Sequence, residues 1–173
     1  MKIILAYVTS LDGMITDAKG RSPVDWASRE DQTNFRKLIK ASEVVIIGTN
    51  TYLAHRDPIR ASKSPRRIVM TSEPERFMFD TKPGLLEFTD APPRAIVTSL
   101  KKQGVRKVLL ASGPKLTNEF LRQKLVDELH LTVEPAFFGS GTLAAPASTS
   151  LKLMSVKKLN SKGTLLIKYR ILR

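Results

Sequence analysis

Short apolar runs, each ended by a glycine or a hydroxyl residue, are the feature that most constrains how this chain can fold. Such runs lie in three predicted strands, Glu43–Gly48 (EVVIIG), Arg67–Thr71 (RIVMT) and Val105–Ala111 (VRKVLLA), the last of which is followed by Ser112. Continuous apolar runs of this length are typical of strands that are covered on both faces of a parallel sheet. Because parallel strands need crossover connections, the segments between the runs are expected to contain helices.

The connecting segments carry helix signals. Ser28 has the character of an N-cap, and Phe35, Leu38 and Ile39 follow it with helical spacing. Further helices are expected from Thr49 to Ala54, from Pro92-Pro93 to the residues before Gly104, and over about residues 115–124. Strands alternating with helices predict an α/β domain with helices on both faces of the sheet.

The two ends of the chain complete the predicted sheet. Residues 2–8 form an apolar first strand, and Leu129, Leu131 and Val133 alternate with polar residues on a later one. Residues 151–159 and 164–172 are two strands joined by a turn, which is a hairpin signal, and Leu165, Ile167, Tyr169 and Ile171 mark its buried face. We therefore predict a single domain over residues 1–173: a three-layer α/β/α fold whose central sheet is mixed, mostly parallel, and ends in an antiparallel hairpin.

Composition excludes several classes of protein. The 173 residues include no cysteine, which excludes disulfides and thiolate metal sites and fits a cytoplasmic location. No apolar run is long enough for a membrane helix, so no membrane partner is expected. The net charge of +13 attracts anions, or it reflects solubility alone. The basic residues are scattered and aromatic residues make up only 6%, so a nucleic-acid platform is not favoured.

Three loops that each follow an apolar run have residues suited to phosphate groups. The first is Gly48–Tyr52 and the third is Ser112–Thr117, and in both a glycine precedes a predicted helix start, where free backbone N–H groups can bind an anion. The second is Thr71-Ser72, whose strand begins with Arg66-Arg67; hydroxyl and guanidinium groups suit a ribose 2′-phosphate. No loop matches the standard dinucleotide fingerprint or a P-loop.

The order of these segments resembles the dihydrofolate reductase superfamily, and within it the reductase domain of the bifunctional deaminase-reductases of riboflavin biosynthesis. The resemblance runs over nearly the whole chain. It rests on Ser10–Gly13, on Ser28–Phe35 followed by Val45–Tyr52, on Arg67–Ser72, on Val108–Leu116, and on Leu125–Leu131 with Pro135 and Gly139–Gly141 after it.

This resemblance implies an NADPH-dependent reductase, a homodimer in its relatives, that transfers a hydride to a pyrimidine- or pterin-type substrate. The first candidate reaction is that of 5-amino-6-(5-phosphoribosylamino)uracil reductase. A dihydrofolate or pterin reductase and a non-catalytic nucleotide- or nucleic-acid-binding module on the same fold are the alternatives. The implied cofactor residues are Ala6 and Thr9 at the nicotinamide, Gly48, Thr49, Thr51, Arg66, Arg67 and Ser72 around the adenosine phosphates, and Gly113, Pro114, Lys115, Leu116 and Thr117 at the pyrophosphate.

Thr49 stands where many relatives carry an arginine, so the phosphate contacts are expected to depend on Arg66 and Arg67. The substrate is expected against Asp12, Gly13 and Trp26.

Asp12 and Asp31 are the candidate catalytic residues. Asp31 precedes Phe35 by four residues, as the substrate-binding carboxylate of dihydrofolate reductases does, but its position three residues after Ser28 also suits a helix cap. Asp12 precedes a glycine, a common turn pair, and Trp26 either anchors a loop or forms one wall of a pocket. His130 is expected to be structural, and two histidines without ligand spacing predict no metal site.

Overall fold

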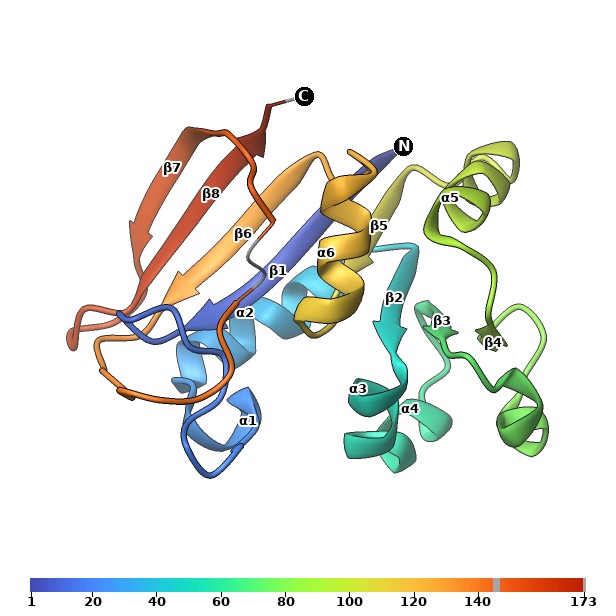
Figure 1. Cartoon of the computed structure of the whole chain (residues 1–173), viewed down its shortest axis with the longest axis horizontal. Coiled ribbons are helices and arrows are strands. Elements are labelled where there is room, and N and C mark those ends of the chain that lie inside the picture. Colours follow the sequence, from blue (N-terminus) through green and yellow to red (C-terminus); the bar gives the residue numbers. More distant parts are fainter. Residues whose placement is uncertain (145–146, 173) are drawn as a thin grey trace.

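The apolar runs form the centre of an eight-stranded sheet with the order β4-β3-β2-β5-β1-β6-β8-β7 (Figure 1). The structure is a computed structural model that describes residues 1–144 and 147–172. Strands β1 to β6 pair in parallel, whereas β8 runs antiparallel to both β6 and β7. The predicted mixed sheet with a terminal hairpin is therefore confirmed. The strands are β1 Lys2–Thr9, β2 Val44–Gly48, β3 Arg66–Met70, β4 Leu86–Thr89, β5 Lys107–Leu110, β6 Glu128–Val133, β7 Leu151–Lys158 and β8 Leu165–Ile171.

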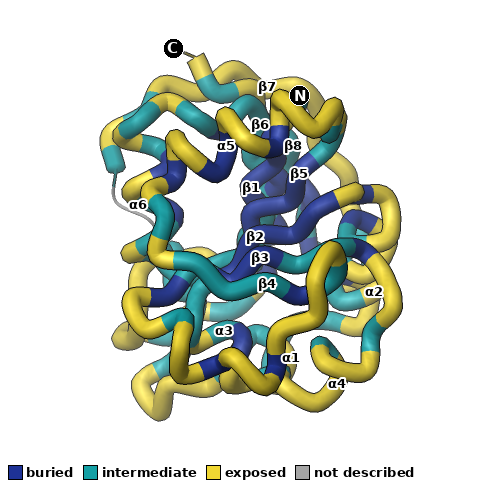
Figure 2. The backbone as a smooth tube through the Cα atoms, turned by 90° about the vertical axis from the view of Figure 1, so that its right-hand side faces the viewer, coloured by how far each residue is buried: buried dark blue, intermediate teal, exposed yellow. Residues whose placement is uncertain are grey.

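Helices cover both faces of the parallel part of the sheet. On one face, α5 (Pro93–Lys102) and α6 (Pro114–Arg122) bury Leu100 and Phe120 against β1, β2 and β5. On the other face, α2 (Arg29–Lys40) and α3 (Thr49–Ala54) bury Leu38 and Tyr52. Buried residues accordingly gather in the central strands (Figure 2). The other short helices are α1 Pro23–Trp26, α4 Arg56–Ala61 and the 3-10 helix η1 Pro74–Asp80.

Residues 1–144 and 147–172 contain no helix long and apolar enough to cross a membrane.

The burial of the terminal hairpin differs from the prediction. Leu165, Ile167, Tyr169 and Ile171 were expected on its buried face, but all four are half-buried, and the buried residue of β8 is Leu166 on the opposite face. The alternation identified correctly which side chains share a face. It could not show that α5 and α6 lie over β1, β2 and β5 and that their layer does not extend to the hairpin.

Candidate active site

Two of the predicted phosphate loops lie side by side where β2 and β5 end. The two strands are neighbours, and the Ala111 N–H donates to the Ile46 carbonyl at 3.0 Å. The segments that follow β2 and β5 therefore leave the sheet at the same level. A Cβ atom added to Gly48 would lie 3.0 Å from the Ser112 hydroxyl. This close approach explains the glycine and joins the loops into one surface at the carboxyl ends of the strands, where ligands of open α/β sheets bind.

The start of α6 leaves open space for a ligand. Gly113 is the N-cap, and a Cβ atom added to it would meet nothing within 4 Å. The backbone N–H of Thr117 donates to the Gly113 carbonyl and its buried hydroxyl donates to the Ser112 carbonyl at 3.2 Å, so the Thr117 side chain holds the turn. The first-turn N–H groups of Lys115 and Leu116 remain to receive an anion.

The loop after β3 lies beside the start of α3. The Thr49 hydroxyl donates to the Met70 carbonyl at 3.4 Å, which links the two loops, and Thr71 accepts the Glu73 N–H at 3.2 Å. Ser72 is exposed at this edge. Thr49, Thr71 and Ser72 are therefore brought together with Gly48.

Arg66 and Arg67 are not brought to this edge. They begin β3, and its five residues, at about 3.3 Å each, separate them from Ser72 by roughly 16 Å or more. Arg66 forms an ion pair with Glu87 at 2.7 Å, while Arg67 donates to the Ser62 hydroxyl at 2.9 Å. Their predicted contact with the cofactor phosphates has no support in this geometry, so both are left out of the candidate site. The sequence already placed the two arginines at the start of this strand, and the prediction overlooked that the length of the strand separates them from the hydroxyl residues at its end.

Asp12 holds two loops together. Its carboxylate accepts hydrogen bonds from the Ser10 hydroxyl at 2.5 Å and from the backbone N–H groups of Phe138 and Gly139. The bond from Ser10, with those from Gly139 and Phe138, lowers the pKa of Asp12 to about 2. Asp12 is therefore ionised at neutral pH and has no proton to donate, although a substrate-facing role for it and for Gly13 stays a prediction.

The same two loops form a short ribbon beside the site. The N–H of Ile15 donates to the Thr142 carbonyl at 2.8 Å, and Met14 bridges Leu143. At Gly141, where φ is +148°, an added Cβ atom would lie 1.9 Å from the Thr16 carbonyl oxygen. Only glycine permits this approach.

The ring of Trp26 packs next to the ribbon. Its ring lies edge-on to that of Phe138, with the centroids 4.9 Å apart. Its indole nitrogen is buried and has no hydrogen-bond partner within the described part of the chain. A buried N–H group without a partner costs free energy, so this donor is left unsatisfied in the folded chain.

Asp31 is the buried carboxyl group of the site. The Ser28 hydroxyl caps α2 by accepting the Asp31 backbone N–H at 3.2 Å, as predicted. The reciprocal bond of a capping box is not made by Asp31, because the Ser28 N–H donates instead to Glu134 at 2.9 Å. The Asp31 side chain is only 7% exposed and bonds to the hydroxyl of Thr132 on β6.

Burial raises the pKa of Asp31 to about 6. This net value includes the bond from Thr132, which lowers the pKa, and the negative charge of Glu134, which raises it. Ala6 lies on the same face of the sheet, since Val8 pairs with Thr132 and Ala6 pairs with His130. A carboxyl group that gains and loses its proton near neutral pH thus lies beside the strand predicted to line the nicotinamide.

Glu134 is a site residue that sequence reasoning missed. It is 7% exposed and joins three segments: it accepts the Ser28 N–H, it accepts the Thr164 hydroxyl at 2.6 Å, and its charge acts on Asp31. Asn160 accepts the Thr164 N–H and donates to Glu30, which completes the network. The available signal was an acidic residue directly after an apolar strand and before Pro135.

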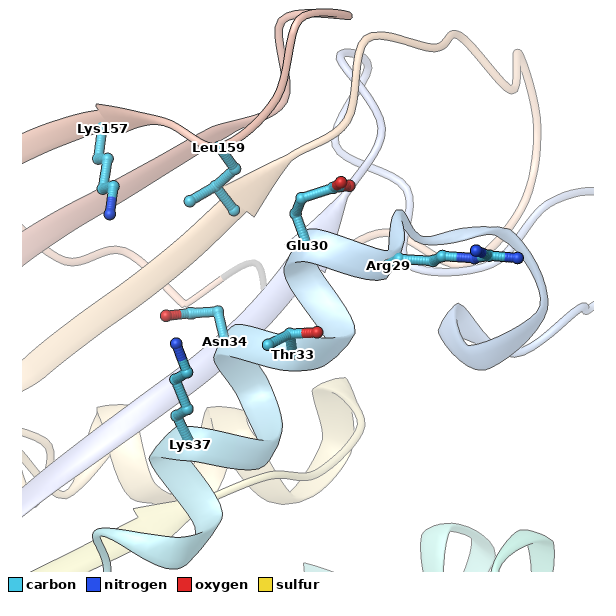
Figure 3. A pocket seen from close by; sticks show the side chains of 7 residues that line it. All are labelled: Arg29, Glu30, Thr33, Asn34, Lys37, Lys157 and Leu159. Carbon is cyan, nitrogen blue, oxygen red and sulfur yellow. The ribbon is translucent and has the colours of Figure 1, made fainter.

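A basic groove lies outside this constellation. It has a volume of about 280 Å³ and runs between α2 and the end of β7, and none of the predicted site residues lines it. Asn34 and Lys37 on α2 and Lys157 on β7 point into the space between helix and hairpin, whereas Arg29 points away (Figure 3). The groove shows that this face of the hairpin is polar.

His130 has a structural environment, as expected. It is 9% exposed, its ring nitrogen lies 3.2 Å from Glu128, and burial lowers its pKa. No group of three potential metal ligands occurs among residues 1–144 and 147–172.

Comparison with known proteins identifies the family. The model of the RibD C-terminal domain matches residues 1–165. The chain belongs to the RibD C-terminal domain family. Its curated relatives include two uncharacterized proteins of Bacillus subtilis (strain 168). YwjB is 27% identical over 168 residues, and the alignment covers 94% of this chain and 90% of YwjB. YyaP is 22% identical over 173 residues, and the alignment covers 92% of this chain and 90% of YyaP.

Solved structures of RibD-type proteins share the fold. A deaminase/5-amino-6-(5-phosphoribosylamino)uracil reductase from Thermotoga maritima matches with a TM-score of 0.77 at 19% identity, over 99% of this chain and 56% of that one. This chain thus spans about half of that bifunctional protein. A putative riboflavin biosynthesis protein from Shewanella sp. PV-4 matches over 100% of both chains, with a TM-score of 0.76 at 20% identity. These matches confirm the predicted dihydrofolate-reductase-like fold.

Proposed function

We propose that this RibD-family domain is an NADPH-dependent reductase of a pyrimidine- or pterin-type substrate, with Asp31 as its proton-holding residue. The observation that carries the proposal is the buried Asp31 carboxyl group, whose pKa is raised to about 6. A buried, partly protonated carboxyl group at the carboxyl end of a parallel sheet is a candidate acid. The raised pKa also costs folding free energy, which a purely structural carboxylate would not need to incur.

The loops at the carboxyl ends of β2, β3 and β5 fit a dinucleotide. The open space at Gly113 and the N–H groups of Lys115 and Leu116 suit a pyrophosphate, and the contact between Gly48 and Ser112 brings the loop after β2 next to them. The exposed hydroxyl of Ser72 suits a ribose 2′-phosphate, which is the basis for proposing NADPH rather than NADH. When bound, NADPH would supply the hydride and be oxidised to NADP⁺.

The chain itself would supply position and a proton. Hydride addition to the carbon of a C=N or C=O bond leaves a negative charge on the nitrogen or oxygen, which a proton must neutralise. With a pKa of about 6, about one Asp31 carboxyl group in ten carries that proton at pH 7. Thr132 orients the carboxyl group from β6, and Trp26 offers a further N–H group to the substrate.

Two substrates are candidates, for different reasons. The family and the Thermotoga maritima neighbour support 5-amino-6-(5-phosphoribosylamino)uracil, reduced at its sugar. The Asp31 carboxylate also suits a pterin, because an ionised carboxylate accepts two parallel N–H bonds from a 2-aminopyrimidine edge.

The test is NADPH oxidation against both substrates, with Asp31→Asn and, as a matched control, the exposed Asp90→Asn. We expect turnover of one substrate by the parent protein and by D90N, and a loss of roughly 100-fold or more in D31N, the usual contribution of a positioned acid. Full activity of D31N would overturn the role of Asp31, and an absence of NADPH binding would overturn the proposal itself.

The cofactor part is tested separately by thermal shift. NADPH should raise the melting temperature of the purified protein more than NADH does. The Gly113→Val variant should fold, since open space surrounds that position, and should lose the NADPH shift, whereas the smaller Gly113→Ala should keep part of it. An unchanged NADPH shift in G113V would contradict the pyrophosphate turn.

A further inference from the structure

Two lysines from facing elements line the basic groove between α2 and β7. The side chains of Lys37 and Lys157 both point into the space between the helix and the hairpin (Figure 3). Neither lysine has an ion-pair partner among residues 1–144 and 147–172. Two like charges on facing elements repel one another, and an anion between them would turn this repulsion into two attractions.

The remaining charge of the groove lies at its other end. Glu30 accepts a hydrogen bond from the Asn160 side chain at 3.2 Å, and this bond lowers the pKa of Glu30, so its carboxylate is ionised. Lys37 follows Glu30 by seven residues, which is about 10 Å along the helix. Thr33 and Asn34 line the groove between these two ends and provide neutral hydrogen-bonding groups.

The sheet behind the groove adds positive charge on the same side. Lys157 pairs with Leu166 and Lys168 pairs with Ser155, so both lysines lie on the face of the hairpin that is turned toward α2. Burial lowers the pKa of His130 on the neighbouring strand, and the positive charge of Lys168 acts in the same direction. The basic end of the groove is therefore the end that attracts an anion.

We infer that the basic groove binds a small phosphate monoester, with its phosphate between Lys37 and Lys157. A phosphate ester has about −1.5 to −2 charges at neutral pH and three acceptor oxygens, which suit ammonium groups from two sides. The Glu30 carboxylate at the other end accepts hydroxyl groups and repels a second phosphate. A hydroxylated monoester therefore fits the groove better than a polyphosphate, and a volume of about 280 Å³ is close to that of small-molecule sites.

The groove is separate from the proposed cofactor surface. That surface lies where β2, β3 and β5 end, whereas three strands separate β5 from β7 in the sheet. None of the residues that line the groove belongs to the proposed nucleotide loops. The inference therefore goes beyond the proposed reductase and does not depend on it.

Hydrogen bonds connect the groove to the candidate site. Asn160, which donates to Glu30, also accepts the Thr164 N–H, and the Thr164 hydroxyl donates to Glu134 at 2.6 Å. The charge of Glu134 in turn acts on Asp31. An ester whose hydroxyl groups contact Glu30 would therefore act on one end of the network that reaches Asp31.

Amide NMR tests where the anion binds. Inorganic phosphate and glycerol phosphate are titrated in turn into the isotope-labelled protein at constant ionic strength. The amide signals of Asn34 and Leu159 should shift and saturate, and glycerol phosphate should bind more tightly than inorganic phosphate because it also has hydroxyl groups. Shifts confined to Lys115 and Leu116 would locate the anion at the start of α6 and overturn the groove site, while leaving the cofactor proposal standing.

Charge-matched variants separate the groove from the general charge of the chain. Lys37→Gln and Lys157→Gln each remove one charge from the groove. Lys40→Gln on α2 and Lys158→Gln on β7 remove the same charge outside it, and all four side chains are exposed, so folding should be unaffected. K37Q and K157Q should each weaken the binding of glycerol phosphate by roughly fivefold or more, whereas K40Q and K158Q should stay within about twofold of the parent protein.

Three results would overturn the proposal. The first is an absence of saturable shifts at Asn34 and Leu159 with millimolar glycerol phosphate. The second is an equal loss of binding in all four variants, which would show attraction by the net charge of +13 alone. The third is displacement of glycerol phosphate by a single-stranded oligonucleotide with a steep salt dependence, which would make the groove part of a nucleic-acid surface.

Discussion

The raised pKa of Asp31 predicts a pH-dependent gain in stability when the carboxyl group is removed. In the unfolded chain the group has its ordinary pKa of 3.8, and burial raises it to about 6 in the folded protein. The folded state therefore binds the proton more tightly, so the stability associated with neutral Asp31 is fully present below pH 3.8 and is lost as the pH rises through 6. The variant Asp31→Asn has no proton to lose and avoids this cost.

The size of the effect follows from the two pKa values. Each tenfold change in acidity corresponds to about 1.4 kcal/mol, so the difference amounts to about 3 kcal/mol above pH 7. Asp31 is 7% exposed, so solvent screening reduces this value little. For a domain of this length, it corresponds to a gain of roughly 6 to 12 °C in melting temperature.

The assay is thermal unfolding of the parent protein, D31N and the exposed control D90N at several values between pH 4.5 and pH 8. The advantage of D31N over the parent should grow with pH up to about 7 and then level off, while D90N should follow the parent. Any constant offset from the new amide cancels in this comparison. If the parent and D31N keep the same difference at every pH, Asp31 is not a buried proton-binding group, and the reasoning fails.

Three further outcomes are expected. Thr132→Val removes the hydrogen bond that lowers the pKa of Asp31, so the pH at which the Asp31 carboxyl signal titrates in NMR should rise; a fall would contradict the assignment. Gly141→Ala places a Cβ atom 1.9 Å from the Thr16 carbonyl oxygen, so urea unfolding should show a loss of about 2 kcal/mol or more; an unchanged midpoint would show that the ribbon can relax. Asp80→Asn weakens the buried acceptor of one tyrosine and two arginines, which should cost about 1 to 3 kcal/mol in the same assay, and no cost would show that water replaces those bonds.

The strands of the central sheet could be predicted because the residues that indicate each strand are adjacent in the sequence. The runs Val44–Ile47 and Val108–Leu110 are apolar and buried, and the glycine and hydroxyl residues that follow them lie within two residues of their ends. The phosphate loops could be predicted from the same local signals. Parallel strand ends share an edge, so the fold class predicted that the loops lie at one edge of the sheet. That β2 and β5 are neighbours, which brings Gly48 against Ser112, was not predicted.

The substrate side could be predicted only in part, because its contacts join distant segments. Asp31 has the spacing of a helix cap, and nothing in residues 28–35 shows that Glu134 takes the Ser28 N–H and leaves the Asp31 side chain turned toward Thr132. Likewise, alternation correctly placed Leu165, Ile167, Tyr169 and Ile171 on one face of β8, but it did not show that this face is only half-buried. Which layer covers such a face depends on where the helices pack, and that information lies outside the hairpin.

The residues of the proposed cofactor surface and those of the substrate side are synthesised at different times. The loops of the proposed cofactor surface lie between Gly48 and Thr117, whereas Asp12 bonds to Phe138 and Gly139, and Glu134 bonds to Thr164. A nascent chain that ends before residue 134 would hold every nucleotide loop and would lack Glu134 and Phe138, which contact Ser28 and Trp26. Substrate recognition would be acquired last, when the hairpin adds to β6, so a truncated chain that still binds nucleotide need not be able to use it.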